Sequence, residues 1–153
     1  MTSWPRTRYH IETVLRVPLP FAYRWCTDFR PDDARREGEV YERRILERGP
    51  RSVVFEDLEP TSGGWRWSRH VVRLRPPNRW HSESVGNYRD VSIDYVLTSL
   101  GPARTRFEMF WKRRATPLAG RPPSRASTEK GTLAAWRNFA KSIEADYRRI
   151  HRH

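Results

Sequence analysis

The sequence predicts an α+β fold in which an antiparallel sheet of about seven strands packs against a long C-terminal helix. From about Ser124 onward, apolar residues recur at steps of three and four, which indicates an amphipathic helix. Between residues 40 and 114, short segments rich in β-branched and aromatic residues alternate with turn residues. Because these turns are too short for helical crossovers, the strands should be antiparallel neighbours rather than members of a doubly wound parallel sheet.

Composition and length indicate a folded protein. A chain of 153 residues can bury one core, and seven Trp, six Tyr and six Phe supply the bulk that disordered chains lack. The single cysteine, Cys26, excludes an internal disulfide, and no apolar run resembles a signal peptide or a membrane helix. We therefore expect a cytoplasmic protein with a single domain over residues 1–153 and a core over about residues 9–150.

The N-terminal part predicts a strand followed by short helices. Residues 9–17 alternate well enough to form a strand, and the prolines that follow end it. From Pro20 to Phe29 the apolar residues have helical spacing, with Pro20 suited to a first turn, and Pro31 closes this helix. Residues 31–38 predict a second helical turn or a polar loop that ends at Gly38. Two short helices should therefore precede the second strand.

Six further strands should form a meander with one apolar face and one charged face. In the last of them, every second residue from Thr105 to Trp111 belongs to the apolar face. Phe110 is an exception, because it is an aromatic residue on the charged face. The predicted strands span residues 40–47, 52–58, 64–74, 79–85, 88–100 and 104–114.

The C-terminal helix follows a proline- and glycine-rich loop or lid over residues 115–123. Ser124, Ser127 and Thr128 are candidate N-caps, because a hydroxyl can accept from the free amides of a first helical turn. The apolar stripe of this helix needs a partner surface, which the apolar face of the sheet can supply. Its members are Leu133, Trp136, Phe139, Ala140, Ile143, Tyr147 and Ile150.

This order of elements resembles the helix-grip fold of the START-like (SRPBCC) superfamily, which includes polyketide cyclases/dehydrases and lipid-transfer proteins. The stretch YHIETVLRVPLPFAYRWCTDF resembles the opening strand and proline-initiated helix, and TLAAWRNFAKSIEADYRR resembles the closing helix. The resemblance covers about residues 9–150 and implies a curved sheet wrapped around the long helix, with a cavity between them for a hydrophobic molecule. No short catalytic motif defines the superfamily, so the resemblance assigns no catalytic residues.

Aromatic residues dominate the expected interior. On the sheet and on the helix they could line a mostly apolar pocket with a few polar anchors, or they could simply pack together as a core. With the resemblance, a pocket is the preferred interpretation. The predicted ligand-binding residues are Trp65, Trp67, Trp80, Ile93, Tyr95, Phe107, Met109, Trp111, Trp136, Phe139, Ile143 and Tyr147.

The leading functional hypothesis is therefore the binding of a lipid-like or polyketide-like small molecule. An enzyme of the cyclase/dehydratase type is an alternative, with Tyr95, His70 or His81 as weak candidates for a proton carrier. His70 follows Trp67 by three residues, so in an unbulged strand we expect it to point outward, opposite to Trp67. A titratable side chain inside the pocket would favour the enzyme.

The net charge of +12 suggests a third hypothesis, a basic interaction protein that contacts nucleic acid or another anionic surface. The arginines are spread along the chain rather than gathered in one basic tail, so this hypothesis is not favoured. The basic residues expected on the outer face of the sheet are Arg43, Arg66, Arg104, Arg106, Lys112 and Arg114.

No cofactor or metal site is expected. His10, His70 and His81 lack the spacing of metal ligands, and Cys26 has no CxxC context. Glycine-rich phosphate-binding loops are also missing from the sequence. The oligomeric state and the identity of the ligand are left open.

Overall fold

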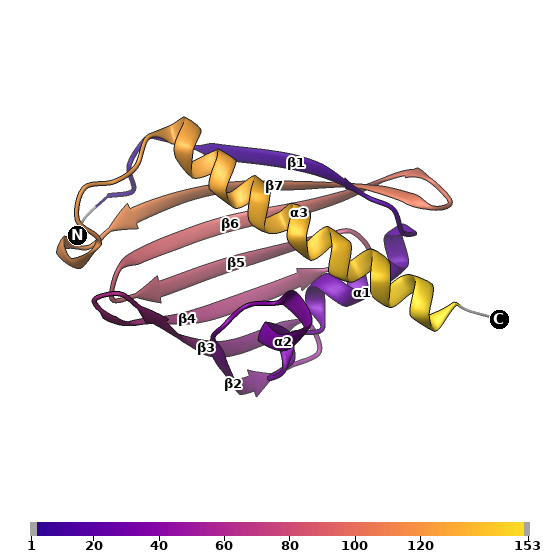
Figure 1. Cartoon of the computed structure of the whole chain (residues 1–153), viewed down its shortest axis with the longest axis horizontal. Coiled ribbons are helices and arrows are strands. Elements are labelled where there is room, and N and C mark those ends of the chain that lie inside the picture. The colour runs from indigo at the N-terminus through magenta and orange to yellow at the C-terminus, as the bar shows by residue number, and fades with distance from the viewer. Residues whose placement is uncertain (1–2, 152–153) are drawn as a thin grey trace.

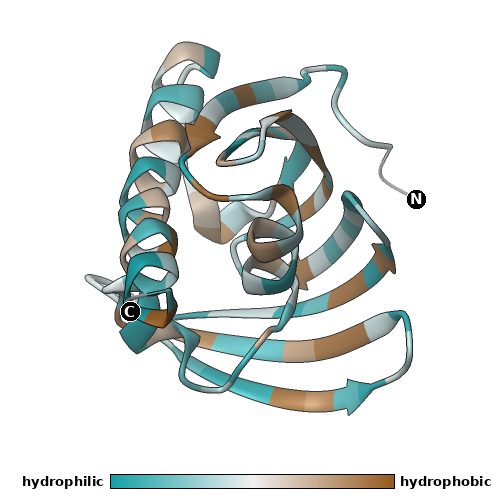
Figure 2. Ribbon diagram, turned by 90° about the vertical axis from the view of Figure 1, so that its right-hand side faces the viewer, coloured by the Kyte–Doolittle hydropathy of each residue, from teal (hydrophilic) through white to brown (hydrophobic). Residues whose placement is uncertain are grey.

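The computed structural model describes residues 3–151, which form one seven-stranded antiparallel sheet with a long helix across its concave side (Figure 1). Figure 2 shows the same arrangement from the side, with the long helix upright and the sheet curving away from it. In chain order the elements are β1 (Tyr9–Leu15), α1 (Leu19–Thr27), α2 (Asp33–Glu37), β2 (Glu42–Arg48), β3 (Ser52–Thr61), β4 (Gly64–Arg75), β5 (Arg79–Gly86), β6 (Arg89–Gly101), β7 (Arg104–Ala115), the 3₁₀ turn η1 (Pro117–Ala119) and α3 (Arg125–Ile150).

The strand order β1-β7-β6-β5-β4-β3-β2 confirms the predicted meander. Each strand from β2 to β6 pairs with the next through a short turn, and β7 also pairs with β1. The strands β1 and β2 are therefore the two edges of the sheet, and α1 and α2 connect one edge to the other. The predicted strand limits differ from the observed ones by a few residues, as in β3, which continues to Thr61.

Helix α3 begins where it was predicted to begin. The Ser124 hydroxyl accepts a hydrogen bond from the Ser127 amide at 3.1 Å, so Ser124 is the N-cap. The predicted apolar stripe holds in the middle of the helix, where Ile143 is fully buried, but Ile150 is 57 % exposed because the last turn extends past the sheet. None of the helices within residues 3–151 is both long enough and apolar enough to cross a membrane.

Under β1, β6 and β7, the sheet and α3 pack directly against each other. Phe107 and Ile143 are fully buried, and the indole of Trp136 stacks on Phe107 with ring centroids 4.0 Å apart. A side chain of α3 also contacts the backbone of β1: the Glu129 carboxylate accepts a hydrogen bond from the amide of His10 at 2.7 Å. This half of the molecule is a closed core.

At the other edge, α2 is held to the sheet by charge. The guanidinium of Arg43 on β2 donates to Asp33 of α2 at 2.6 Å and to both carboxylate oxygens of Asp57 on β3, at 2.8 and 2.9 Å. It also lies 4.2 Å from the ring centroid of Phe55. The Arg43 side chain is only 9 % exposed, so the two carboxylates compensate a cation that has lost most of its water.

A second arginine extends this network to α1 and α3. Arg36 of α2 donates to Asp33 at 2.9 Å and to Asp28 at 3.0 Å, and its guanidinium lies 4.8 Å from the ring centroid of Trp25. The indole of Trp25 in turn donates to Asp146 of α3 at 2.9 Å. The two arginines therefore connect α1, α2, β2, β3 and α3.

Replacement of Arg43 by alanine should lower the free energy of unfolding by about 3 to 5 kcal/mol, because Asp33 and Asp57 would lose their shared cation. The control is Arg30→Ala, which breaks an exposed arginine pair with Asp32 and should leave the unfolding midpoint nearly unchanged. Urea unfolding of the two variants measures both effects. Equal stability of Arg43→Ala and the wild type would contradict this role.

Candidate functional site

A cavity of about 240 Å³ lies between the sheet, α1, α2 and α3, beside the closed core. We call it the deep chamber. Aromatic rings form much of its wall, and charged groups of the α2 network form another part. Its lining residues are Trp25, Cys26, Phe29, Asp33, Glu37, Tyr41, Arg43, Phe55, His70, Trp80, Ser82, Ile93, Tyr95, Trp136 and Phe139.

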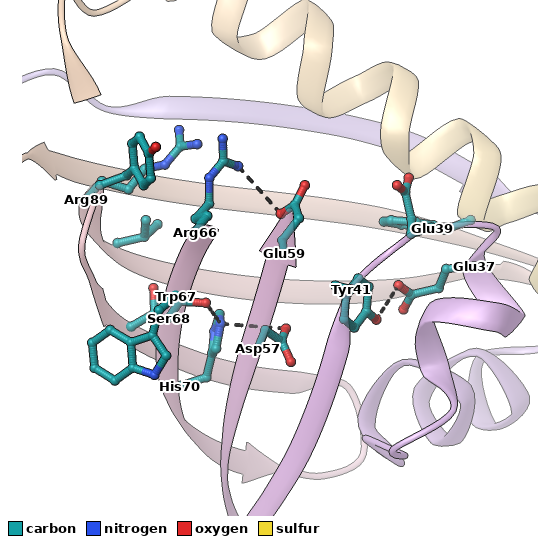
Figure 3. Close-up of a pocket in the computed structure, with 14 residues that line it drawn as sticks. Glu37, Glu39, Tyr41, Asp57, Glu59, Arg66, Trp67, Ser68, His70 and Arg89 are labelled. Atoms are coloured by element: carbon teal, nitrogen blue, oxygen red, sulfur yellow. Dashed lines mark hydrogen bonds and ion pairs between the residues drawn. The ribbon is translucent and has the colours of Figure 1, made fainter. Parts of the chain in front are cut away.

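A second cavity of about 350 Å³, here called the mouth chamber, adjoins the first (Figure 3). The two share four lining residues, Glu37, Tyr41, His70 and Phe139, and so follow one another along the sheet. The mouth chamber is more polar than a closed core. Its other lining residues are Glu39, Asp57, Glu59, Arg66, Trp67, Ser68, Ser84, Tyr88, Arg89 and Val91.

The alternation of β4 differs from the prediction. Val72 is buried, so the residues that share its face, including His70 and Arg66, point to the cavity. Trp65 and Trp67 then have their side chains on the other face: Trp65 is 55 % exposed, and the Trp67 indole donates to Glu56 at 3.3 Å, although Trp67 also borders the mouth chamber. The expectations that these two rings face the interior and that His70 faces outward are therefore wrong.

Strands β5 and β6 supply the aromatic wall of the deep chamber. Trp80 pairs with Tyr95 across the two strands, and their rings stack with centroids 4.6 Å apart. Ser82 and Ser84 follow Trp80 on the same face and are buried. Within residues 3–151 neither serine hydroxyl has a hydrogen-bond partner, so both are free to serve a bound molecule.

Tyr95 presents a phenol to the deep chamber. Burial raises the pKa of this phenol above its ordinary range, so it keeps its proton at neutral pH. No hydrogen bond within the described part of the chain uses its hydroxyl. The neighbouring Cys26 is similar, because burial raises the pKa of its thiol and holds it in the protonated form.

Glu37 is the carboxyl group that both chambers share. It sits at the end of α2, where Gly38 leaves the helix with a φ of 72°. The Tyr41 hydroxyl donates to Glu37 at 2.7 Å, but burial dominates and raises the pKa of Glu37 to about 7. The side chain is therefore divided between acid and base near neutral pH, as general acid–base chemistry requires.

His70 is held as a neutral imidazole. Its ring stacks on Phe55 with centroids 4.6 Å apart, and Nε2 lies 2.8 Å from the Ser68 hydroxyl and 3.9 Å from Asp57. Burial lowers the pKa of His70 to about 4, and the nearby Asp57 offsets only part of that effect. At neutral pH this imidazole carries no charge, and it can donate one hydrogen bond and accept another.

The remaining predicted site residues lie in four places. Tyr147 packs edge-on against Phe21, with ring centroids 5.0 Å apart, away from both chambers. His81 lies on the outer face, where its ring contacts Asp94 at 2.8 Å and Glu83 at 3.3 Å. The predicted residues in the closed core are Phe107, Met109, Trp111 and Ile143, and those that line the deep chamber are Trp80, Ile93, Tyr95, Trp136 and Phe139.

The inner positions of Arg43 and Arg66 also correct the predicted basic outer face, because neither lies on it. Among the described residues, one group of three has metal-ligand spacing: His10, Glu12 and Glu108, within 4.8 Å of one another on the outer face. His10 contacts Glu108 at 3.1 Å and its ring stacks on that of Phe110. The hydrogen bond between His10 and Glu108 brings two of these three side chains together.

Glu37 and His70 should give opposite contributions to the pH dependence of stability. The ordinary pKa of a Glu side chain is 4.5, and that of Glu37 is raised to about 7. Between pH 4.5 and about 7 the folded protein therefore holds a proton that the unfolded chain has lost, so the contribution of Glu37 to stability falls as pH rises. The lowered pKa of His70 means that the unfolded chain holds the extra proton between about 4 and 6.5, so this contribution grows as pH rises.

Glu37→Gln should therefore become more stable relative to the wild type as pH rises from about 4.5 to 7, by at most about 1.4 kcal/mol per pH unit. His70→Gln should lose stability relative to the wild type as pH rises from about 4 to 6.5. Urea titrations at a series of pH values measure both differences. A difference that does not vary with pH would contradict the assigned environment of that side chain.

The sequence matches no protein-family model and no curated protein. Solved structures do match. A protein of Thermus thermophilus superposes with a TM-score of 0.72 at 12 % identity, over 92 % of this chain and 99 % of that one. The Zhui aromatase/cyclase of Streptomyces sp. R1128 superposes with a TM-score of 0.71 at 16 % identity, over 95 % and 97 % of the two chains.

A START superfamily protein of Mycobacterium smegmatis superposes with a TM-score of 0.69 at 13 % identity, over 94 % of this chain and 98 % of that one. Nearly the whole of each chain takes part in these matches, so the likeness includes the sheet, the short helices and α3 together. Such low identities establish the fold and leave the activity open. The chain thus has the START-like helix-grip fold.

Proposed function

We propose that the protein binds a hydrophobic or amphipathic small molecule in the two adjoining chambers between the sheet and α3. The observation that carries this proposal is the combination of aromatic walls and unpartnered polar groups in one cavity. Trp80, Tyr95 and Trp136 offer ring faces, and the hydroxyls of Ser82 and Tyr95 offer hydrogen bonds. Ligand sites are built in this way, with apolar walls and a few polar groups that fix orientation.

The cavity walls are supported from behind, which keeps the space open. The Trp80–Tyr95 stack is backed by Tyr23 of α1, whose ring lies 5.8 Å from that of Trp80 and whose hydroxyl donates to the Arg79 carbonyl at 2.9 Å. On the opposite side, the ion pair of Arg43 with Asp33 fixes the position of α2 relative to the sheet. A preformed site of this kind spends little free energy on rearrangement when a ligand enters.

The structural neighbours support the proposal in general terms. One is named an aromatase/cyclase and another a START superfamily protein, and both share the fold of this chain over nearly their whole length. Their names describe those proteins, and the ligand of this chain has to be sought from its own cavity. The volumes of the two chambers, about 240 and 350 Å³, suit a molecule of a few fused rings or a medium acyl chain.

The neutral fluorophore N-phenyl-1-naphthylamine tests this proposal. It should bind the wild type and gain fluorescence, and Ser82→Leu should abolish the gain because the larger side chain fills the deep chamber. Ser92→Leu, which adds the same side chain on the outer face of the neighbouring strand, should bind like the wild type. No binding to the wild type, or equal binding to both variants, would contradict the proposed site.

A second candidate function is catalysis of the cyclase/dehydratase type. The specific observation that favours it is Glu37, a carboxyl group on the cavity wall with a pKa near 7. Such a group can remove a proton from a carbon between two carbonyl groups, while the Tyr95 phenol can donate a hydrogen bond to a carbonyl oxygen. Both groups line the deep chamber.

A synthetic 3,5-dioxo thioester of N-acetylcysteamine is a suitable test substrate for this second function. In this substrate, removal of a proton between the two ketones lets the enolate oxygen attack the thioester carbonyl, which closes a lactone and releases N-acetylcysteamine, with the proton returned to the thiolate. If the protein is such an enzyme, the wild type should accelerate this loss of the thioester, and Glu37→Gln should lower kcat by at least about a hundred-fold while it still binds N-phenyl-1-naphthylamine. Chromatography of the products measures the rate. A wild type that binds the fluorophore but leaves the thioester unchanged, or an active Glu37→Gln, would contradict this role of Glu37.

A further inference from the structure

Three arginines surround the outer end of the mouth chamber. A neighbouring hollow of about 250 Å³, here called the lid pocket, shares Arg66, Tyr88 and Arg89 with the mouth chamber and adds Arg113. Its remaining wall comes from the segment that leads to α3, through Ala115, Ala119, Pro122 and Pro123. A ligand that enters the cavity from this side must pass the three guanidinium groups.

These arginines have few partners. Within residues 3–151, the side chain of Arg89 makes no hydrogen bond, ion pair or ring contact. Arg66 lies over the ring of Tyr88 and 3.7 Å from Glu59, which is beyond hydrogen-bond distance, and its Nε is buried without a hydrogen-bond partner. Within the same part of the chain, Arg113 has a hydroxyl and a ring as partners but no carboxylate. One carboxylate, Glu59, therefore faces three cations.

The contrast with the rest of the interior is informative. Arg43 is matched by two carboxylates and Arg36 by at least two, at distances of 2.6 to 3.0 Å. At the mouth, burial, followed by repulsion from Arg66 and Arg113, lowers the pKa of Arg89. A partly buried cation without a counter-charge destabilises the empty protein, and an anion would remove that cost.

The position of Arg89 is fixed by the turn before it. Asn87 accepts from the Trp67 amide at 2.8 Å and donates to the Trp65 carbonyl at 2.9 Å, which fastens the turn to β4. The Thr116 hydroxyl donates to the Asn87 carbonyl at 2.6 Å. Figure 3 shows the side chains of Arg66 and Arg89 projecting from the sheet toward the same side.

We infer that the ligand is an amphiphile whose carboxylate or phosphate group is bound by Arg66 and Arg89 at the mouth, while its apolar part fills the deep chamber. The inference rests on the proposed binding function. Two guanidinium groups that point the same way can each donate a pair of hydrogen bonds to such an anion. The apolar part then reaches Trp80, Tyr95 and Trp136 through the shared wall of the two chambers.

Two fluorophores with the same aromatic skeleton provide the test, since 8-anilino-1-naphthalenesulfonate carries a sulfonate that N-phenyl-1-naphthylamine lacks. Arg89→Met should weaken binding of the sulfonate by at least about ten-fold and leave the neutral compound within about two-fold of the wild type. Arg73→Met is the matched control, because Arg73 lies exposed on the outer face of β4 and its loss removes the same charge. It should change neither affinity.

Competition then identifies the anionic group. Dodecanoate and dodecyl phosphate should each displace N-phenyl-1-naphthylamine at least about ten-fold better than dodecanol, and Arg89→Met should remove that advantage. The stronger of the two anions shows whether the natural group is a carboxylate or a phosphate. Equal competition by all three compounds, or an anion preference that survives in Arg89→Met, would overturn the inference.

The two proposals fail in different ways. If the neutral fluorophore does not bind at all, the binding function itself is wrong. If it binds and Ser82→Leu blocks it, but the sulfonate binds no better and Arg89→Met has no effect, only the anion inference is wrong. Thermal unfolding of Arg89→Met without ligand checks the fold: its midpoint should equal or exceed that of the wild type, because the variant removes an unpartnered cation.

Discussion

The ion pairs of Arg43 are the constraint on which the cavity depends. This buried guanidinium is satisfied only while Asp33 of α2 and Asp57 of β3 both stay within hydrogen-bond reach. The geometry fixes the distance between α2 and the sheet and prevents α2 from settling onto the apolar residues beneath it. Because the charges would be left unpaired in a collapsed structure, the space between helix and sheet stays open.

The same constraint divides the molecule into a packed half and a hollow half. Under β1 and β7 the apolar stripe of α3 meets apolar strand residues such as Phe107, and the two surfaces pack against each other. Under β3 and β4 the inner face carries polar groups such as His70 and Asp57, which line the mouth chamber. The result is a cavity with aromatic walls at its deep end and with Arg66, Arg89 and Arg113 around its mouth.

The sequence was sufficient to predict the order and type of the elements, because turns, prolines and helical spacing are local signals. The site was predicted less completely. In β4 both faces carry large residues. Placing Trp67 on the inner face exchanges the two faces of the strand, whereas placing Val72 there puts His70 and Arg66 on the correct side. The burial of Arg43 could not be foreseen, because its partners Asp33 and Asp57 come together only through the α2 connection and the β2–β3 hairpin.

A crystal structure with bound 8-anilino-1-naphthalenesulfonate tests the account most directly. We predict that the aromatic rings lie in the mouth chamber, between the sheet and α3, with the sulfonate oxygens within about 3 Å of the Arg66 and Arg89 guanidinium groups. Electron density for the compound on the outer face of the sheet alone, with the space between sheet and α3 filled by side chains, would contradict it.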